Sequence, residues 1–244
     1  ISYHFLDDSF DGEILKKIKN YDYILVSIPP KNGIDIVIKN FQKTLETLQA
    51  NWITYLSATS VYGDHNGEWV DENSKANPLT ENGKSRLNAE KIWINLAKKK
   101  NLPIQIFRLS GIYSQERNIL KKIKSRSHQI INKPEHFFSR IHVEDISNLL
   151  IISLNFNNIK PGEIYNLSDD YPCSNIEVAN YAYDLMKISK PKMVEISEVE
   201  NKMLVNFYKD SKKIKNKKIK EIFSYKFKFP TYKEGLNNIF NHNI

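Results

Sequence analysis

Short apolar runs and amphipathic stretches alternate along the first half of the chain. Tyr23–Ile28, Trp52–Leu56 and Pro103–Leu109 are mostly apolar and have the length of buried strands. Between them, the apolar positions of Ile34–Ala50 recur with a period near 3.6, which predicts an amphipathic helix, and we expect a second helix over Gly83–Lys99. Strands and helices in this alternation predict a parallel sheet with right-handed crossovers.

The second half has a more mixed pattern. We expect a helix over Val143–Ser153 and a strand over Glu163–Leu167. Another helix is predicted over Asn175–Lys187, where Ser174 is a suitable N-cap and Glu177 stands where it would complete a capping box. The remainder alternates short segments and prolines, without an internal repeat or a flexible linker.

The chain is basic, with a formal net charge of +8 and a pI near 9.2. Its densest basic run is Lys209–Lys220, which is either a solvated face or a surface that contacts phosphate groups. Lysine accompanies abundant isoleucine and asparagine throughout, and no glycine–aromatic pattern of an RNA-binding module is present. Composition therefore favours the solvated face and argues against a nucleic-acid partner.

The single cysteine, Cys173, excludes an intramolecular disulfide. No apolar run approaches the roughly 20 residues of a membrane span, and no signal peptide opens the sequence. Cysteine and histidine do not occur at metal-site spacing, and there is no G-x-S-x-G hydrolase motif. We therefore expect a cytoplasmic protein without a membrane partner and without a bound metal.

Two motifs in the first half of the chain carry the specific signal. Residues 55–63 read Tyr-Leu-Ser-Ala-Thr-Ser-Val-Tyr-Gly, and residues 78–90 read Pro-Leu-Thr-Glu-Asn-Gly-Lys-Ser-Arg-Leu-Asn-Ala-Glu. Further segments follow at 107–113, 140–146, 161–167 and 225–236. In this order they resemble the extended short-chain dehydrogenase/reductase family, the NAD-dependent epimerases and dehydratases, and within it the atypical YeeZ-like subgroup. The resemblance covers nearly the whole chain.

The resemblance implies an α/β fold, a Rossmann-type doubly wound parallel sheet with a smaller interleaved C-terminal substrate domain. Residues 1–115 would form the dinucleotide-binding portion and 116–244 the substrate side, with 143–168 returning to the sheet. The chain begins at Ile1 in a strand-like stretch, Ser2–Leu6, and its 8 glycines include no G-x-G-x-x-G. We therefore expect the first strand–helix units to lie upstream, so that this sequence is N-terminally truncated, and a chain without them to bind NAD poorly.

The family's catalytic positions are substituted. The resemblance implies a tyrosine acid/base, a lysine that lowers its pKa and a serine or threonine that orients the substrate. The matching positions are Asn82, Arg86 and Ala58. An amide cannot exchange a proton near neutral pH, and a guanidinium is not a compact ammonium. A shift of one residue would place Thr59 in the serine position, but residues 80–90 contain no tyrosine.

Other residues could take over proton transfer. Tyr62 and Tyr113 are candidate acids, although tyrosines in such strands are usually packing residues. His142 stands between Arg140 and Asp145, a trio that could hold an anionic ligand or move a proton. The alternative, which we favour, is a buried histidine that fixes a loop to the following helix.

The cofactor would lie along the carboxyl ends of the strands. The resemblance places Asp7 near adenine, although a solvated turn carboxylate is an equal alternative, and Arg86 near the ribose or a phosphate unless it is a helix-surface arginine. The sequence does not distinguish NAD from NADP. The full candidate set is Asp7, Ser27, Ile28, Pro29, Leu56, Ser57, Arg86, Leu109, Ser110 and Gly111.

Two functional interpretations follow. The first is an NAD(P)-binding protein of the epimerase/dehydratase superfamily whose catalytic set is replaced, with weak or unconventional activity or a binding and sensing role. The second is an active oxidoreductase or epimerase that uses other residues on a nucleotide sugar. Asn82 and Ala58 favour the first. In both, the partner is a small molecule, a sugar nucleotide being one option, and a homodimer is compatible with the sequence.

Overall fold

Four parallel strands form the central sheet of the computed structural model, which describes residues 17–156 and 158–242. The strands are β1 (Tyr23–Val26), β2 (Trp52–Ala58), β4 (Ile104–Leu109) and β9 (Glu163–Leu167), paired in the order β1-β2-β4-β9. The predicted parallel α/β sheet is confirmed. All six residues of β4 are buried, as its apolar sequence predicted. β1 differs, because only its Val26 is buried and the strand ends two residues before the predicted Ile28.

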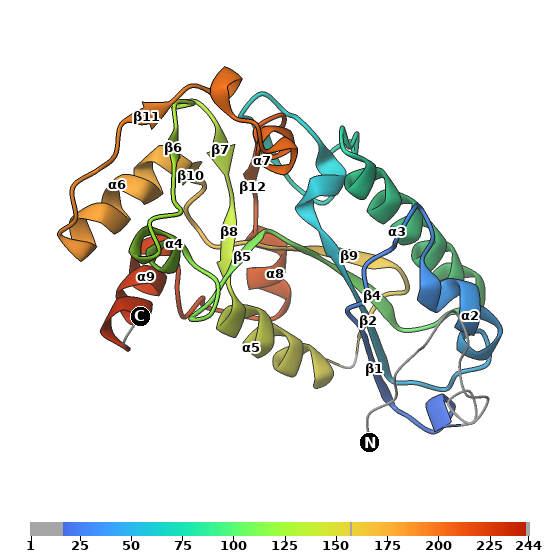
Figure 1. The fold of residues 1–244 in the computed structure, drawn as a ribbon. Coiled ribbons are helices and arrows are strands. Elements are labelled where there is room, and N and C mark those ends of the chain that lie inside the picture. The colour runs from blue at the N-terminus through green and yellow to red at the C-terminus, as the bar shows by residue number, and fades with distance from the viewer. Residues whose placement is uncertain (1–16, 157, 243–244) are drawn as a thin grey trace.

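Helices cover both faces of this sheet (Figure 1). On one face, α2 (Ile36–Leu45) and α3 (Glu81–Lys100) pack against the sheet, with Trp93 fully buried in the shared core. On the other face, α5 (Val143–Leu154) packs in a second core with β4 and β9. The sheet is therefore a layer between helices, which leaves its carboxyl edge as the place where side chains of several strands meet.

Local capping sets the helix ends, and here the structure differs from the hydropathy pattern. α2 begins at Ile36 because the Asp35 carboxylate caps it, accepting from Val37 N at 2.9 Å and Ile38 N at 3.0 Å. It ends at Leu45, well before the predicted Ala50. α3 begins at Glu81, two residues earlier than predicted, because Thr80 accepts from Gly83 N at 3.1 Å.

A smaller, mixed region continues from β4. Its first layer is the parallel pair β5 (Gly111–Tyr113) and β8 (Arg140–His142). Two longer helices, α6 (Asn175–Met186) and α9 (Tyr232–Asn241), belong to this region. The remaining elements of the chain are short: η1 (Thr59–Tyr62), β3 (Trp69–Val70), α4 (Ile119–Lys124), β6 (Ile130–Ile131), β7 (Phe137–Phe138), β10 (Cys173–Ser174), β11 (Met193–Val194), η2 (Ile196–Glu198), α7 (Lys202–Phe207), β12 (Lys213–Ile214) and α8 (Lys217–Ile222).

The N-terminus of α6 corrects one prediction. Ser174 is the N-cap and its hydroxyl accepts from Glu177 N at 3.1 Å, as expected. The Glu177 carboxylate does not complete the capping box, because it instead accepts a hydrogen bond from the Tyr232 hydroxyl at 3.1 Å. A complete capping box occurs at α9, between Thr231 and Glu234. A tertiary contact has thus replaced a local one.

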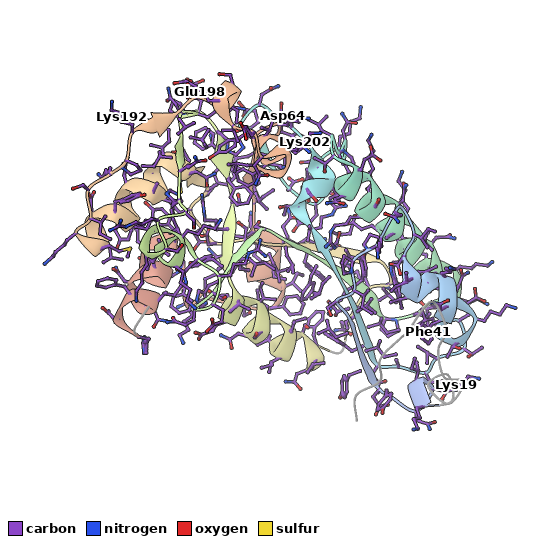
Figure 2. All side chains as sticks on the ribbon, in the orientation of Figure 1. Lys19, Phe41, Asp64, Lys192, Glu198 and Lys202 are labelled. Carbon is purple, nitrogen blue, oxygen red and sulfur yellow. The ribbon has the colours of Figure 1, made fainter. Side chains whose placement is uncertain are left out.

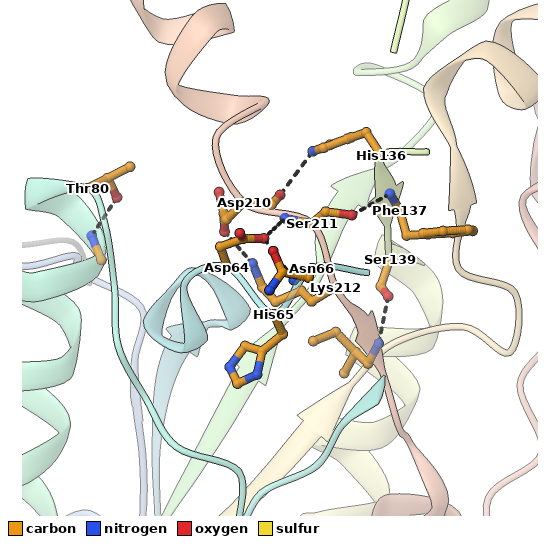
Figure 3. A network of polar contacts seen from close by, with 12 residues as sticks. Asp64, His65, Asn66, Thr80, His136, Phe137, Ser139, Asp210, Ser211 and Lys212 are labelled. Carbon is orange, nitrogen blue, oxygen red and sulfur yellow. Dashed lines mark hydrogen bonds and ion pairs between the residues drawn. The ribbon is translucent and has the colours of Figure 1, made fainter. Parts of the chain in front are cut away.

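A network of polar contacts ties the loop after η1 to the C-terminal part of the chain (Figure 3). Ser211 N donates to Asp64 Oδ1 at 2.8 Å, and Phe137 N donates to Ser211 Oγ at 2.9 Å. The His136 ring lies 2.9 Å from the Asp210 carbonyl oxygen through Nε2, which therefore carries the proton. These bonds hold three distant segments together beside the smaller region.

Candidate functional site

Hydroxyl groups without partners mark the carboxyl edge of the sheet. Ser57, near the end of β2, and Ser110, directly after β4, are buried, and neither Oγ has a hydrogen-bond partner among the described residues. Ser27–Pro29 follow β1 at the same edge and are exposed. Buried hydroxyls are normally bonded, so these two fit a polar ligand such as a dinucleotide. Asp7 lies outside the described residues.

The substituted catalytic positions lie around the end of β2. Arg86 Nη1 donates to the Leu56 carbonyl oxygen at 3.1 Å, so this arginine reaches the strand end and is not a free helix-surface side chain. Asn82, one turn earlier in α3, is exposed. A Cβ on Gly83 would stand 2.9 Å from the Ser60 carbonyl oxygen, which shows how closely this turn approaches η1. β2 extends two residues beyond the predicted Leu56, so that Ala58 is the last residue of the strand.

A buried ion pair continues along α3. Glu90 accepts two bonds from Arg108 Nε, at 3.1 and 3.2 Å, and one from Arg108 Nη2 at 2.7 Å. The same guanidinium lies 4.7 Å from the centre of the Tyr62 ring. The Tyr62 hydroxyl donates to Asn166 Oδ1 at 2.7 Å, and burial raises the pKa of Tyr62 to about 12. Tyr62 is therefore a packing residue whose hydroxyl proton is held in the bond to Asn166. Thr59 lies buried in η1.

His142 acts as the N-cap of α5. Its Nδ1 accepts from Glu144 N at 3.3 Å, and its ring packs 4.1 Å from Phe229 and 5.1 Å from Tyr113 between ring centres. Burial lowers the pKa of His142, which keeps the ring neutral near neutral pH. The structure therefore places His142 where it fixes a loop to the following helix, the alternative that the sequence favoured.

The residues flanking His142 serve different parts of the fold. Asp145 accepts from the Tyr225 hydroxyl at 2.6 Å and from Lys228 N at 2.7 Å, so it anchors the C-terminal segment. Arg140 instead donates from Nη1 to the Phe138 carbonyl oxygen at 2.9 Å and lines a pocket. Although Arg140 and Asp145 are close to His142 in sequence, their side chains do not form one site around it.

The pocket lined by Arg140 has a volume of about 590 Å³ and begins where β4 passes into β5. A Cβ on Gly111 would lie 2.3 Å from Phe138 Cε1, so only glycine allows this ring to lie against the strand end. The polar side chains that the sequence pattern did not identify come from the two residues before α4, α4 itself, the following loop, α6 and the residue after α7. They are Arg117, Asn118, Lys122, Ser127, His128, Gln129, Asn175 and Tyr208.

The basic run at Lys209–Lys220 is largely paired with other side chains. Lys220 lies 2.9 Å from Asp170, Lys217 lies 3.6 Å from Glu221, and Lys215 lies 4.0 Å from Asp71. Lys212 and Lys218 pair with Asp210 and Glu163, and Lys213 lies 4.0 Å from the centre of the Phe137 ring. Five of the six lysines from 212 to 220 thus pair with a carboxylate, which leaves little unpaired charge for a phosphate backbone.

Two other classes of site were searched in the described part of the chain. No group of three or more histidine, cysteine, aspartate or glutamate side chains there could hold a metal ion. None of its helices combines the length and the apolar character that crossing a membrane requires. The pocket and the carboxyl edge of the sheet therefore remain the candidate site.

Comparison with solved structures places this architecture among known folds. The fold matches the UDP-glucuronic acid 4-epimerase from Bacillus cereus in complex with NAD, with a TM-score of 0.74, 16% identity and coverage of 95% of this chain and 78% of that chain. It also matches the dTDP-glucose 4,6-dehydratase from Bacillus anthracis str. Ames in complex with NAD, with a TM-score of 0.75, 18% identity and coverage of 96% and 78%. The protein thus has the Rossmann-like fold of the NAD-dependent epimerases and dehydratases.

A nearer relative shows the family. A functionally unknown conserved protein from Silicibacter pomeroyi DSS is 35% identical, with a TM-score of 0.84 over 90% of this chain and 77% of that chain. The chain belongs to the family of this protein. No protein-family model and no curated protein matches the sequence.

Proposed function

We propose that this protein binds a nicotinamide dinucleotide along the carboxyl edge of its sheet and a small molecule in the adjoining pocket. The observation that carries the proposal is the position of Gly111, which both follows the end of β4 and lines the pocket. The unpartnered hydroxyls of Ser57 and Ser110 would meet the cofactor at the same edge. When bound, the dinucleotide supplies a hydride acceptor or donor. The relatives solved with NAD support this assignment.

A binding or sensing role explains the substitutions better than conventional catalysis. Asn82 cannot act as an acid/base, and Ala58 has no hydroxyl to orient a carbonyl. Arg86 is bonded to the Leu56 carbonyl oxygen, where it can hold the strand end and a cofactor hydroxyl but cannot replace a proton donor. The chain's own residues therefore bind and orient.

The competing proposal is an active oxidoreductase or epimerase on a nucleotide sugar. Tyr113 lines the pocket and is its best candidate acid. Burial raises the pKa of Tyr113 far above its ordinary value, and a Cβ on Gly235 would stand 2.1 Å from the Tyr113 hydroxyl, so that hydroxyl lies in a closely packed interior. Both facts favour the binding role.

Calorimetric titration with NAD and NADP tests the proposal and shows which cofactor is preferred. We expect weak but saturable binding, because the sequence contains no G-x-G-x-x-G loop for the phosphates. Ser110→Ala should weaken this binding further, by up to about tenfold, the effect of one lost hydrogen bond, whereas Ser147→Ala on the exposed side of α5 should leave it unchanged. Incubation with the oxidised cofactor and UDP-glucuronic acid should give neither reduced nicotinamide nor an epimerised sugar. Absence of cofactor binding at millimolar concentration would refute the proposal, and formation of reduced nicotinamide or of an epimerised sugar would establish the enzyme alternative.

A further inference from the structure

We propose that the small molecule of this pocket is an anion and that the Arg140 guanidinium binds it. This inference rests on the proposed function, because it names the chemical class of the pocket's ligand. Arg140 is 9% exposed and belongs to β8, whose backbone is fixed by its pairing with β5. Its charged group is thus held rigidly at the wall of the pocket.

The hydrogen bonds of Arg140 leave part of its guanidinium free. Nη1 donates to the carbonyl oxygens of Phe138 at 2.9 Å and Cys173 at 3.3 Å, and Nη2 donates to Asn175 Oδ1. Within residues 17–156 and 158–242, Nε has no acceptor. A guanidinium has five N–H groups, so donors remain for a ligand.

The charge of Arg140 has no counter-ion within the described part of the chain. All of its acceptors there are neutral: two carbonyl oxygens, a thiol sulfur and the Asn175 amide. The Asp169 carboxyl group lies in the field of Arg140 but forms no hydrogen bond with its guanidinium; burial raises the pKa of Asp169 well above its ordinary value, and Arg140 acts in the opposite direction. Buried charges in proteins are normally paired, so an uncompensated guanidinium at a pocket wall indicates an anionic ligand.

The rest of the pocket has the same electrostatic character. Arg117 and Lys122 are exposed at its rim, and its lining contains no aspartate or glutamate. The Phe138 ring lies 5.2 Å from Arg140 Cζ and 4.5 Å from the Phe207 ring centre, which forms an aromatic wall beside the cation. The pocket therefore fits an anionic group carried on a planar or apolar body.

Asn175 stands where an ion pair would have its carboxylate. Its Oδ1 accepts from Arg140, and its Nδ2 donates to the Tyr208 hydroxyl at 3.1 Å. An aspartate of the same shape would neutralise the guanidinium from within the protein. The presence of an amide there keeps the positive charge available to a ligand.

A purely structural arginine is the competing explanation, because the bonds to Phe138 and Cys173 connect β7, β8 and β10. Binding of three probes that share a ring separates the two explanations: phenyl phosphate, benzoate and the neutral benzyl alcohol. We expect saturable binding of phenyl phosphate, benzoate or both, and much weaker binding of benzyl alcohol. The stronger anion identifies a phosphate or a carboxylate as the preferred group.

Variants locate the charge that is responsible. Arg140→Met should weaken anion binding about 10- to 100-fold, the range for a hydrogen bond to a charged group. Lys192→Met removes one positive charge from the exposed segment before β11 and should have no effect (Figure 2). Asn175→Asp is the second test if Arg140→Met does not fold. It should abolish anion binding and raise the melting temperature of the ligand-free protein.

Each outcome decides the inference. Equal binding of the alcohol and the anions, no binding of either anion at millimolar concentration, or unchanged anion binding in Asn175→Asp would overturn it. The NAD titration of the unaltered protein is independent of these results. Loss of cofactor binding with intact anion binding would refute the proposed function alone, and the reverse would refute this inference alone.

Discussion

The Glu90–Arg108 pair gives a quantitative test of how the sheet is held to α3. Both side chains are buried, with 1% and 5% exposed, and they share three hydrogen bonds. Burial disfavours the charged form of Arg108, but the bonds and the field of Glu90 outweigh it and hold the pKa of Arg108 above its ordinary value. We expect Glu90→Gln to leave an uncompensated guanidinium in the core without changing side-chain volume.

The expected loss in the free energy of unfolding is large for Glu90→Gln, a single isosteric substitution. Removing one member of a buried ion pair costs about 3–5 kcal/mol, and the side-chain oxygen that Glu90→Gln retains can still accept from Arg108, which favours the lower end. A loss of about 3 kcal/mol corresponds to a fall in melting temperature of roughly 6–12 °C for a chain of this size. The double variant Glu90→Leu/Arg108→Met should recover most of the loss, because it removes both charges.

Urea unfolding followed by tryptophan fluorescence measures these changes, since Trp93 lies on the same helix. The matched control is Glu81→Gln, which removes the exposed pair with Lys84 at 2.7 Å and should cost at most about 1 kcal/mol. Equal losses for the buried and the exposed variant, or a double variant less stable than Glu90→Gln, would show that the reasoning about the buried charge is wrong.

Three further outcomes are expected. Gly235→Ala should cost about 1–3 kcal/mol in urea unfolding, because the new Cβ would stand 2.1 Å from the Tyr113 hydroxyl; an unchanged midpoint would contradict this packing. Burial lowers the pKa of His136 to about 4, below its unfolded value of about 6.5. The contribution of the neutral ring to the free energy of unfolding is therefore complete above pH 6.5 and falls by on the order of 3 kcal/mol toward pH 4. A wild-type pH profile no steeper than that of His136→Gln would contradict this linkage. The triple substitution Ala58→Ser, Asn82→Tyr and Arg86→Lys restores the family's catalytic set. It should change the free energy of unfolding by less than about 1 kcal/mol, since these side chains border the carboxyl edge of the sheet. A larger loss would show that the present side chains are structural.

The sequence predicted the sheet because hydrophobic burial is a local property of each strand. It did not predict where β2 ends, because Ser57 and Ala58 extend the strand by pairing with Arg108 and Leu109 of β4, a partner more than a helix away. Beyond the end of α2, Leu48 and Ala50 are buried as well, so the apolar pattern continues past the helix and does not mark its end. Element type was therefore accessible from sequence, whereas element ends were not.

The candidate site divides in the same way. Arg86 was identified because its spacing from the motif at 55–63 is a sequence property, and its bond to Leu56 followed. The pocket was not predicted, because Arg140 meets Asn175 and Tyr208 only through pairing of β8 and β10 with distant strands. The adjacency of His142 to Arg140 and Asp145 along the chain did not bring their charged groups to one point, which agrees with the structural role that the sequence favoured for His142.

The long-range hydrogen bonds of the loop after η1 have a consequence for the order of folding. Asp64 and Ser211, which are hydrogen bonded, stand 147 positions apart, and β3 pairs with β12 across a similar separation. During synthesis, the strands from β1 to β4 can associate early, whereas this loop gains its partners only when the C-terminal segment has emerged. The segment from 64 to 67 should therefore remain open to proteases on the ribosome-bound chain and close last, together with the wall of the pocket.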